Sequence, residues 1–411
     1  MALTPLTEVQ DEIRAVIGIL PAVAVPLHRA SGHVLAEDVV ATEASPPFEN
    51  SAMDGYAVRA ADTVGASVAA PVRLRVVDDL AAGRAPTVAV GPGEAIRIMT
   101  GAVFPEGADA VVIVERTRRD GSGVLVEAAA TSGDHRRPAG GDVRPGDLVL
   151  HAGGRLHPAA IGVAAALGLE TLRAVPRVRV GVFSTGDELQ AGPAALAVGQ
   201  IRDSNRPMLC ALVEAAGGVA VDLGIARDDE SAITALLEDA FSTCDAVITS
   251  GGVSMGDYDF VKLVLERMGV LRWRQVAIKP AKPLAFGLVD RVPVFGLPGN
   301  PVSALVSFEL FARPSLRRMM AYPDPERPRL RAIVGEDMPR RSDGKLHLDR
   351  VTLDDRGSHL VAARVGPQAS NALAALAAAD GLALLPDGVG VGAGEPVDVL
   401  PLDGFALAGP H

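Results

Sequence analysis

The sequence predicts a multidomain protein of the α/β plus β class, built around a central α/β domain whose sheet is mostly parallel. Its 411 residues exceed what a single hydrophobic core usually supports. Between residues 176 and 325, short apolar strands alternate with helices, which indicates a parallel sheet with helices on both faces. On either side of this segment, short apolar runs broken by glycine and proline predict β-rich domains.

Domain bounds follow from these changes in the pattern of apolar, glycine and proline residues. We expect a small helical-β domain at residues 1–25 and 146–175, an inserted β-rich domain at 26–145, the α/β domain at 176–325 and a C-terminal β-barrel or sandwich at 326–411. In the small domain a helix is expected over residues 9–20, ended by Pro21. In its second helix Pro158 suits the first turn and Gly168 the C-terminal cap.

The remaining elements are expected from short apolar runs and from longer amphipathic ones. Strands are predicted at residues 72–77, 95–99, 110–114, 178–183, 219–225, 246–249, 292–295, 330–334, 345–348 and 396–400. Helices are predicted at residues 207–216, 231–241, 260–268, 302–320 and 372–379. Ligands of a parallel sheet bind at the carboxyl ends of its strands, so the loops after the central strands are candidates for function.

Composition excludes several classes of protein. Hydrophobic residues make up 48% of the chain and charged residues 22%, which is typical of a globular protein. A net charge of −11 argues against nucleic acid as a partner. Cys210 and Cys244 have no paired spacing, so we expect no disulfide framework and a reducing compartment. Without an apolar leader or a membrane-spanning run, a soluble cytoplasmic protein with no membrane contact is expected.

The loop at residues 250–259 follows a predicted strand and combines three glycines, two serines and two aspartates. Bare backbone, hydroxyls and the N-terminus of the next helix favour an anion, whereas Asp257 and Asp259 would repel it. A divalent cation such as Mg²⁺ between carboxylate and phosphate would resolve this conflict. The structural alternative is a glycine turn in which Ser254 or Asp257 caps a helix.

Two further polar loops follow strands of the same domain, at residues 184–188 and 296–303. Asn300 before Pro301 suits a helix start, and N-capping would explain this asparagine without a function. Acidic pairs recur beside these loops, which suits Mg²⁺ binding, with solvated surface acids as the alternative: Asp187 and Glu188, Asp228 and Asp229, Asp257 and Asp259.

The chain has four lysines against 35 arginines, and two of the four are Lys279 and Lys282. A compact ammonium group provides a point charge for phosphate or a small oxyanion. The alternative is a solvated turn fixed by two prolines, Pro280 and Pro283. Outside this domain, residues 46–59 mix buried-type and polar side chains without helix or strand period, as functional loops often do, although a proline-initiated turn would also explain them.

Taken together, seven motifs resemble the molybdenum-inserting enzymes of molybdenum cofactor biosynthesis, the family that includes the E domain of gephyrin. They lie at residues 51–57, 97–102, 137–142, 184–189, 250–259, 279–283 and 298–304. The resemblance implies a transferase that reacts adenylylated molybdopterin with molybdate in the presence of Mg²⁺ and releases AMP. It also implies a molybdopterin-binding α/β domain, a C-terminal β-barrel and an elongated homodimer. The active site would lie between the α/β and C-terminal domains of one subunit and the inserted domain of the other.

The resemblance assigns roles by position. Residues that match the family's catalytic positions are Asp54, Thr100, Asp142, Glu188, Asp228, Asp259 and Lys279, with Arg350 and Ser370 in weaker C-terminal patterns. Substrate-binding positions are Gly251, Gly252, Ser254, Lys282, Pro298, Gly299, Asn300 and Ser303. Glu188, Asp228 and Asp259 are the expected Mg²⁺ ligands, and Asp54 and Thr100 would close the site from the other subunit.

Two departures from the family pattern stand out. Gln275 replaces a usual lysine, so its charge is either absent or supplied by Arg274. Ala281 replaces the usual glycine between the two lysines, which puts close backbone approach there in doubt.

Two rival functions remain. A sister enzyme, molybdopterin adenylyltransferase, resembles residues 176–325 alone and is also a candidate partner. A non-catalytic scaffold, as gephyrin also is, would rely on appended domains. Molybdate and tungstate are alike in charge and size, so the sequence leaves open which oxyanion is used.

Overall fold

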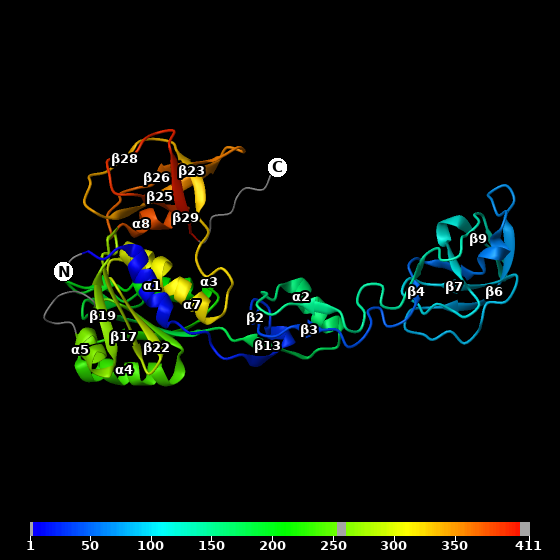
Figure 1. Ribbon diagram of the computed structural model, residues 1–411, viewed down its shortest axis with the longest axis horizontal. Coiled ribbons are helices and arrows are strands. Elements are labelled where there is room, and N and C mark those ends of the chain that lie inside the picture. Colours follow the sequence, from blue (N-terminus) through cyan, green and yellow to red (C-terminus); the bar gives the residue numbers. More distant parts are fainter. Residues whose placement is uncertain (1–2, 253–259, 403–411) are drawn as a thin grey trace. The chain divides into compact units, whose positions relative to one another are not determined.

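The computed structural model describes residues 3–252 and 260–402, which fall into two compact units (Figure 1). One unit comprises residues 1–24, 32–36 and 173–411, and the other comprises residues 25–31 and 37–172. No helix in the described part of the chain is both long and apolar enough to cross a membrane. The predicted division into four domains stays a prediction.

The first helix, α1 (Leu6–Val16), is amphipathic and buries Val9 and Ile13, one turn apart, in the largest core of its unit. The predicted range of 9–20 was wrong at both ends. The helix begins directly after Pro5 and ends before Ile17, whose backbone is extended.

The α/β sheet has the strand order β17-β14-β18-β22-β21-β19 and is mostly parallel, as predicted. Its parallel strands are β17 (Val219–Ala226), β14 (Arg179–Thr185), β18 (Ala246–Ser250) and β22 (Val292–Leu297). Two antiparallel strands that the sequence did not predict extend the sheet, β21 (Pro283–Val289) and β19 (Val270–Gln275). The turn between β21 and β22 has positive φ at both Asp290 and Arg291, a conformation for which this pair gives little signal.

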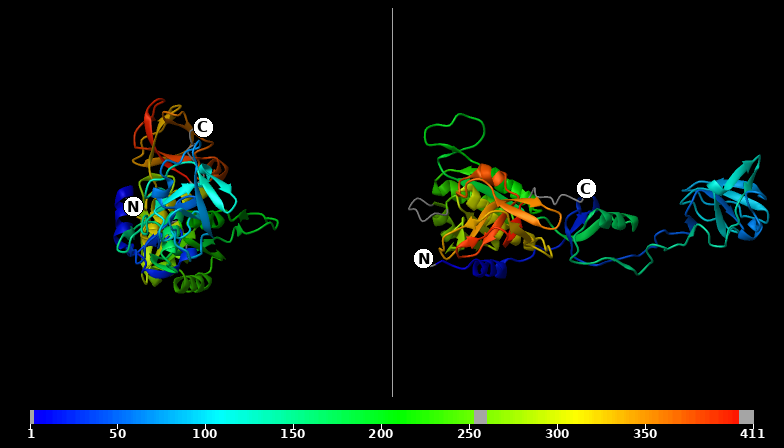
Figure 2. Two further views of the ribbon diagram at one scale, coloured as in Figure 1. Left: turned by 90° about the vertical axis from the view of Figure 1, so that its right-hand side faces the viewer. Right: turned by 90° about the horizontal axis from the view of Figure 1, so that it is seen from above.

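Helices cover both faces of this sheet (Figure 1). They are α3 (Asn205–Ala215), α4 (Glu230–Thr243), α5 (Phe260–Met268), α6 (Pro301–Ser307) and α7 (Arg313–Met319). Neighbouring residues of β14 point to opposite cores: Val182 packs in the core that includes Leu209 of α3, and Phe183 in the core that includes Ile233 of α4. A short ribbon of β15 (Leu189–Gln190) and β16 (Ile201–Arg202) projects from the domain (Figure 2).

A π-helical segment, Phe308–Ala312, interrupts the single helix predicted over residues 302–320. Pro314 lies at the start of α7 and has no N–H to donate to the carbonyl of Leu310 one turn earlier. Gln10 of α1 donates from Nε2 to that carbonyl at 3.1 Å. The carbonyl that the interruption leaves free therefore accepts a hydrogen bond that connects α1 to this helix.

The C-terminal strands close into a barrel, as predicted. β25 pairs with β26, β26 with β23, β23 with β29, β29 with β27, and β27 with β25 again. The strands are β23 (Leu330–Val334), β25 (Leu346–Asp355), β26 (Leu360–Arg364), β27 (Gly381–Leu385) and β29 (Pro396–Pro401). A short pair, β24 (Met338–Pro339) and β28 (Gly390–Val391), and the helix α8 (Leu373–Ala377) complete this part. Leu348, Leu382 and Leu384 join the core of the α/β domain, so barrel and sheet are packed together.

The other unit contains a six-stranded sheet of order β8-β5-β7-β6-β10-β9. Its strands are β5 (Gly55–Val58), β6 (Val72–Leu80), β7 (Glu94–Ile98), β8 (Ala110–Ile113), β9 (Thr117–Asp120) and β10 (Gly123–Val126). Helix α2 (Pro158–Ala166) begins at Pro158 and is followed by Gly168 with positive φ, as predicted. Two two-stranded sheets of this unit are formed by β3 (Val39–Val40) with β12 (Leu148–Leu150) and by β4 (Asn50–Ser51) with β11 (Arg136–Arg137). A three-stranded sheet consists of β1 (Val23–Pro26), β13 (Thr171–Val175) and β2 (Val34–Leu35), whose residues are divided between the two units.

Candidate functional site

The loops after β14, β18 and β22 meet at the carboxyl edge of the α/β sheet, where the sequence placed them. The Gly251 N–H donates to the Leu297 carbonyl at 3.1 Å and joins the second loop to the third. Gly251 and Gly252 both have positive φ. A Cβ at Gly251 would lie only 2.9 Å from the Thr185 carbonyl oxygen. A Cβ at Gly252 would lie 2.6 Å from a methyl carbon of Val261 on α5, so glycine is required at both positions by packing and positive φ, quite apart from any ligand.

Three exposed carboxylates cluster beside the first loop. The Asp228 N–H donates to Asp187 Oδ1 at 3.5 Å, and partial removal from water, together with the charges of Asp187 and Glu188, raises the pKa of Asp228. Asp229 behaves differently because it caps α4, accepting hydrogen bonds from Ser231 Oγ at 2.5 Å and from the Ala232 N–H at 2.9 Å. These bonds lower its pKa. Of this predicted acidic pair, only Asp228 belongs to the cluster.

Part of the predicted metal and substrate set lies outside the described residues, namely Ser254, Asp257 and Asp259. Within residues 3–252 and 260–402, no three His, Cys, Asp or Glu side chains are grouped so as to hold a metal ion. Glu188 and Asp228 thus lie near each other, while their expected third partner, Asp259, is not described.

The third loop brings the C-terminal domain to the same edge. Pro298 is buried, whereas Gly299 and Asn300 are exposed. Asn300 occupies the N-cap position of α6, as predicted, but its side chain makes no capping hydrogen bond, so capping does not account for it. The Val302 N–H donates to the Ser370 carbonyl at 3.1 Å, which places Ser370 against the first turn of α6, next to the buried Ser303.

Lys279 lies on a strand that belongs to the barrel. The two-residue strand β20 (Ile278–Lys279) pairs with the start of β25 and forms one wall of a cavity of about 360 Å³. Arg341, His347, Asp349 and Arg364 line the same cavity, and Arg364 is paired with Asp349 at 2.5 Å. Lys279 and Arg341 are exposed and form no ion pair with any residue in the described ranges.

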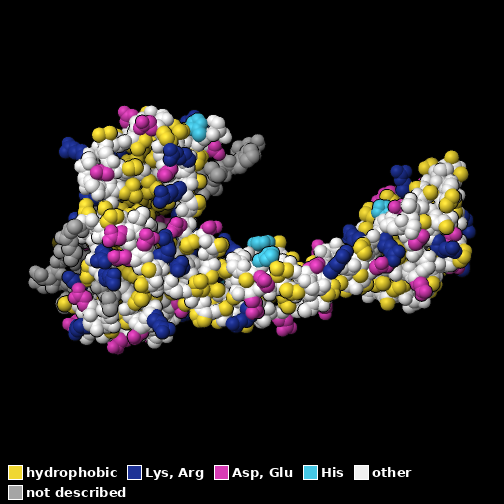
Figure 3. All heavy atoms as spheres, in the orientation of Figure 1, with side chains coloured by type: hydrophobic (Ala, Val, Ile, Leu, Met, Phe, Trp, Pro, Cys, Tyr) yellow, Lys and Arg dark blue, Asp and Glu magenta, His cyan; other side chains and the backbone are white. Residues whose placement is uncertain are grey.

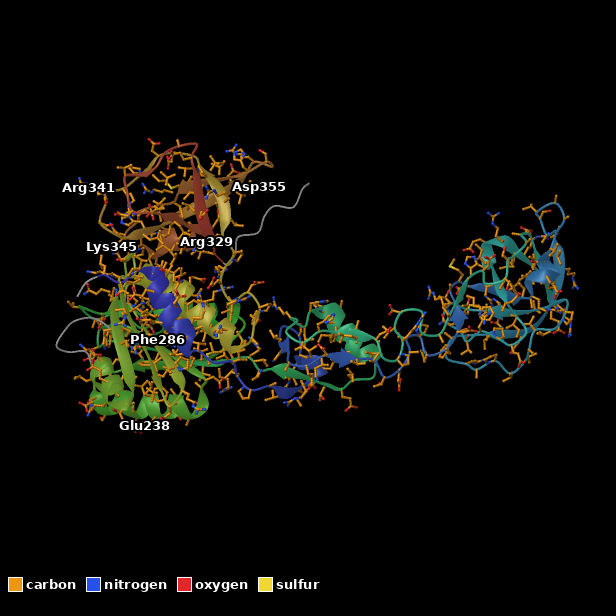
Figure 4. All side chains as sticks on the ribbon, in the orientation of Figure 1. Glu238, Phe286, Arg329, Arg341, Lys345 and Asp355 are labelled. Atoms are coloured by element: carbon orange, nitrogen blue, oxygen red, sulfur yellow. The ribbon has the colours of Figure 1, made fainter. Side chains whose placement is uncertain are left out.

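The cavity is thus lined by two cations that are available to a ligand. Arg341 lies on the barrel (Figure 4), and basic and acidic side chains are interspersed over the face shown in Figure 3. Lys282 is exposed but does not line this cavity.

Arg350 is completely buried beside this cavity. Its Nη2 donates to the carbonyls of Pro367 and, at 3.2 Å, Ala369, while its N–H donates to Gln368 Oε1 at 2.8 Å. Its Nε and Nη1 have no hydrogen-bond partner among the described residues, and burial lowers its pKa. Arg350 therefore holds the loop that leads to Ser370 and keeps unused donor capacity.

The two departures near Lys279 can now be placed. Arg274 donates from Nη2 to Glu12 Oε2 at 2.9 Å, so its charge is neutralised on the side of α1. It does not replace the charge missing at the half-buried Gln275. Ala281 is 3% exposed and has a φ of 74°, a left-handed conformation that glycine adopts more easily.

Asp54 and Thr100 form a direct pair in the other unit. Asp54 Oδ1 accepts hydrogen bonds from the Thr100 N–H and Oγ1, both at 2.7 Å. These bonds, backbone first, lower the pKa of Asp54. Asp142 lines a cavity of about 630 Å³ in the same unit, together with Asn50 and Gly101, the neighbour of Thr100.

Comparison with known proteins identifies the family. The MoeA N-terminal region (domain I and II) matches residues 4–168, a probable molybdopterin binding domain matches residues 181–318, and the MoeA C-terminal region (domain IV) matches residues 331–402. Molybdopterin molybdenumtransferase 2 of Mycobacterium tuberculosis is 44% identical over 409 residues, which cover 96% of this chain and 99% of that protein. The chain belongs to the MoeA family of molybdopterin molybdenumtransferases.

Other relatives of this MoeA-family chain agree. Molybdopterin molybdenumtransferase of Haemophilus influenzae is 36% identical over 383 residues, covering 92% of this chain and 93% of that protein. The crystal structure of the molybdopterin biosynthesis MoeA protein of Pyrococcus horikoshii matches with a TM-score of 0.80 and 32% identity, over 98% of this chain and all of that one. The predicted family and fold class are confirmed, and the chain is an enzyme of the transferase class.

Sequence reasoning missed two residues at the carboxyl edge of the sheet, Asp203 and Asn205. The helix was predicted to start at Pro207, but α3 starts at Asn205. The available signal was the polar run Asp203-Ser204-Asn205 directly before an apolar helix, at the same kind of strand-to-helix junction as the three recognised loops.

Proposed function

We propose that this chain completes the molybdenum cofactor by inserting molybdenum from molybdate into adenylylated molybdopterin, with release of AMP in a Mg²⁺-dependent reaction. The observation that carries the proposal is the presence of two oppositely charged features in one unit. Carboxylates gather at the carboxyl edge of the α/β sheet, and unpaired cations line a cavity on the adjoining barrel. A phosphate-bearing substrate that reacts with an oxyanion needs both features.

A hard divalent cation is proposed to bind carboxylates of this cluster together with Asp259, since the described residues alone contain no group of three that could hold a metal ion. Carboxylate oxygens are the ligands that Mg²⁺ prefers, and a bound cation would relieve the repulsion that raises the pKa of Asp228. Glu188 and Asp228, with Asp259, are the proposed ligands. Mg²⁺ would supply charge neutralisation at the phosphates, while Gly251, Gly252, Ser254 and the loop containing Pro298, Gly299, Asn300 and Ser303 bind the pterin phosphate.

The cations are proposed to bind the oxyanion directly. Lys279 reaches the cavity, and the buried Arg350 holds Ser370 at the start of α6. Lys282 is exposed nearby in sequence and would attract molybdate or phosphate on approach. The sulfur ligands of molybdenum come from the substrate, so positioning and charge neutralisation suffice and no protein nucleophile is needed.

The residues of the other unit are proposed to act across a homodimer. Asp54, Thr100 and Asp142 would reach the substrate bound by the partner subunit, giving a composite site. A molybdopterin adenylyltransferase would supply the adenylylated substrate, because the reaction consumes an activated phosphoanhydride.

One assay tests the proposal directly. The purified chain is incubated with adenylylated molybdopterin and Mg²⁺, with and without molybdate, and AMP is quantified by chromatography. AMP release that requires molybdate is the expected result, whereas hydrolysis indifferent to molybdate contradicts it. Replacing molybdate by tungstate determines which oxyanion is preferred. Full activity in Asp259→Ala would remove that residue from the metal set.

A control reaction separates the rival enzyme class. The chain is incubated with ATP and molybdopterin, and adenylylated product is measured. No accumulation is expected, and accumulation would favour an adenylyltransferase.

A further inference from the structure

Asp203 and Asn205, at the start of α3, contact the ends of three neighbouring strands of the α/β sheet. Asn205 donates from Nδ2 to Ser250 Oγ at 2.7 Å, where β18 ends, and to the Gly299 carbonyl at 2.6 Å, after β22. Two residues earlier, Asp203 Oδ1 accepts from Ser184 Oγ at 3.1 Å, near the end of β14. Strands β14, β18 and β22 are adjacent in the sheet, so this one turn connects all three loops of the proposed substrate site.

The hydrogen bonds fix the orientation of the Asn205 amide. The Gly299 carbonyl can only accept, so the nitrogen of the amide must point toward it. Asn205 is 7% exposed, and its Oδ1 is left buried without a partner among the described residues. The side chain therefore leaves one acceptor unsatisfied while directing both of its donors to the two loops. Alanine would lose both bonds, and aspartate would place a carboxylate against a carbonyl oxygen.

The turn is itself anchored to the domain. The side chain of Asp203 is almost fully buried and accepts from Arg206 Nε at 2.8 Å, and Arg206 also pairs with Asp222 on β17. The Gly251 N–H already joins the starts of these two loops through the Leu297 carbonyl, and Asn205 adds a second connection, from Ser250 to the Gly299 carbonyl. Asn205 thus extends the connection between the loops beyond the last paired residues of β18 and β22.

We propose that Asn205 is a positioning residue that holds the loop after β18 and the loop after β22 at a fixed separation, so that both contact the phosphate end of the substrate. The identity of that substrate depends on the function proposed above, whereas the connection between the loops does not. Loss of Asn205 should therefore loosen two loops that are distant in sequence and weaken substrate binding, without unfolding the domain.

The test uses the full-length chain as wild type, Asn205→Ala and Asn205→Asp. The matched control is Ala211→Ser, an exposed position on the same helix. Hydrogen exchange is followed at residues 249–252 and 296–300, with α4 as internal reference. We expect exchange at both loops to rise by about tenfold in the Asn205 variants. Exchange in α4 should match the wild type, and Ala211→Ser should change neither region.

Kinetics then test the role in the reaction. KM for adenylylated molybdopterin is expected to rise by about tenfold in both Asn205 variants, with a smaller change in kcat. Unchanged exchange at the loops, or faster exchange throughout the domain, would overturn the proposal. Loosened loops with KM within about twofold of wild type would overturn the role in substrate positioning. If the wild type releases no AMP, the proposed function fails, and the exchange experiment still decides whether Asn205 connects the loops.

Discussion

Replacing Asp228 by asparagine should stabilise the protein while impairing its chemistry. Asp228 lies beside Asp187 and Glu188, and both carboxylates help to raise its pKa. Asparagine has nearly the same shape and removes the charge, so the variant loses two repulsive pairs without creating a cavity. Functional carboxylate clusters commonly reduce stability in this way.

The expected magnitude is modest because the cluster is exposed. Exposed charge pairs contribute about 0.2–1 kcal/mol each, so relief of two repulsive pairs, screened by solvent, is about 1 kcal/mol in the free energy of unfolding. For a domain of this size, about 1 kcal/mol corresponds to a rise in Tm of about 2–4 °C.

The gain should depend on pH. An acid with a raised pKa in the folded state destabilises that state only once it is ionised, so the penalty is absent below the unfolded value of 3.8. It grows as the pH rises through the folded pKa and is complete above that pKa. Asp228→Asn should therefore be more stable than wild type at neutral pH and equally stable near pH 3.

Thermal unfolding with and without Mg²⁺ measures both the gain in stability and the loss of Mg²⁺ binding. Mg²⁺ at about 100 times its Kd should stabilise the wild type by about 2.7 kcal/mol and the variant much less. Asp229→Asn is the matched control, because Asp229 is adjacent but has a lowered pKa from its capping bonds. That change should give no stabilisation and should preserve the response to Mg²⁺. A lower Tm for Asp228→Asn at pH 7, or an undiminished Mg²⁺ response, would refute the reasoning.

Three further predictions concern individual contacts. Thr100→Val removes one of two hydrogen bonds to Asp54, so the pKa of Asp54, followed by NMR titration, should rise part of the way toward 3.8. Because a lowered pKa stabilises above 3.8, this variant should lose stability at neutral pH and approach wild type as the pH falls. Ala281→Gly should change stability in urea by less than about 1 kcal/mol, because relief of left-handed strain, about 1–2 kcal/mol, is offset by a lost buried methyl group and a more flexible unfolded chain. Gln10→Leu should destabilise by about 1–2 kcal/mol in the same assay, because the Leu310 carbonyl then lacks a donor.

Much of the fold could be predicted because its signals are local. Alternating apolar strands and helices predicted β14, β17, β18 and β22, and Pro158 with Gly168 predicted the ends of α2. The antiparallel strands β19 and β21 were missed, and the turn that leads from β21 to β22, Asp290-Arg291, carries none of the usual glycine or asparagine signals. The end of α1 was also misplaced, because the sequence continues apolar past the last helical residue, Val16.

Only those residues of the candidate site that lie in loops directly after apolar strands could be predicted. Gly251, Glu188 and Asn300 were recognisable because glycine-rich and acidic residues follow apolar strands. Asn205 was not, because its role depends on hydrogen bonds to Ser250 and Gly299, residues 45 and 94 positions away. Side-chain contacts across such separations leave no periodic pattern in a single sequence.

The placement of Lys279 bears on how the proposed reaction would treat its two anions differently. The Val276 N–H donates to the Lys282 carbonyl at 2.7 Å and closes the short loop between β19 and β21. Lys279 therefore lies in sequence between two strands of the α/β sheet. Its hydrogen bonding nevertheless places it in the barrel, opposite His347 on β25. The carboxylates Glu188 and Asp228 can bind phosphate only through a cation, whereas Lys279 can attract an oxyanion directly. If the proposed function holds, chelating Mg²⁺ and raising the ionic strength should therefore affect different steps, the first at the phosphates and the second at the oxyanion, because salt screens exposed charges over about 10 Å.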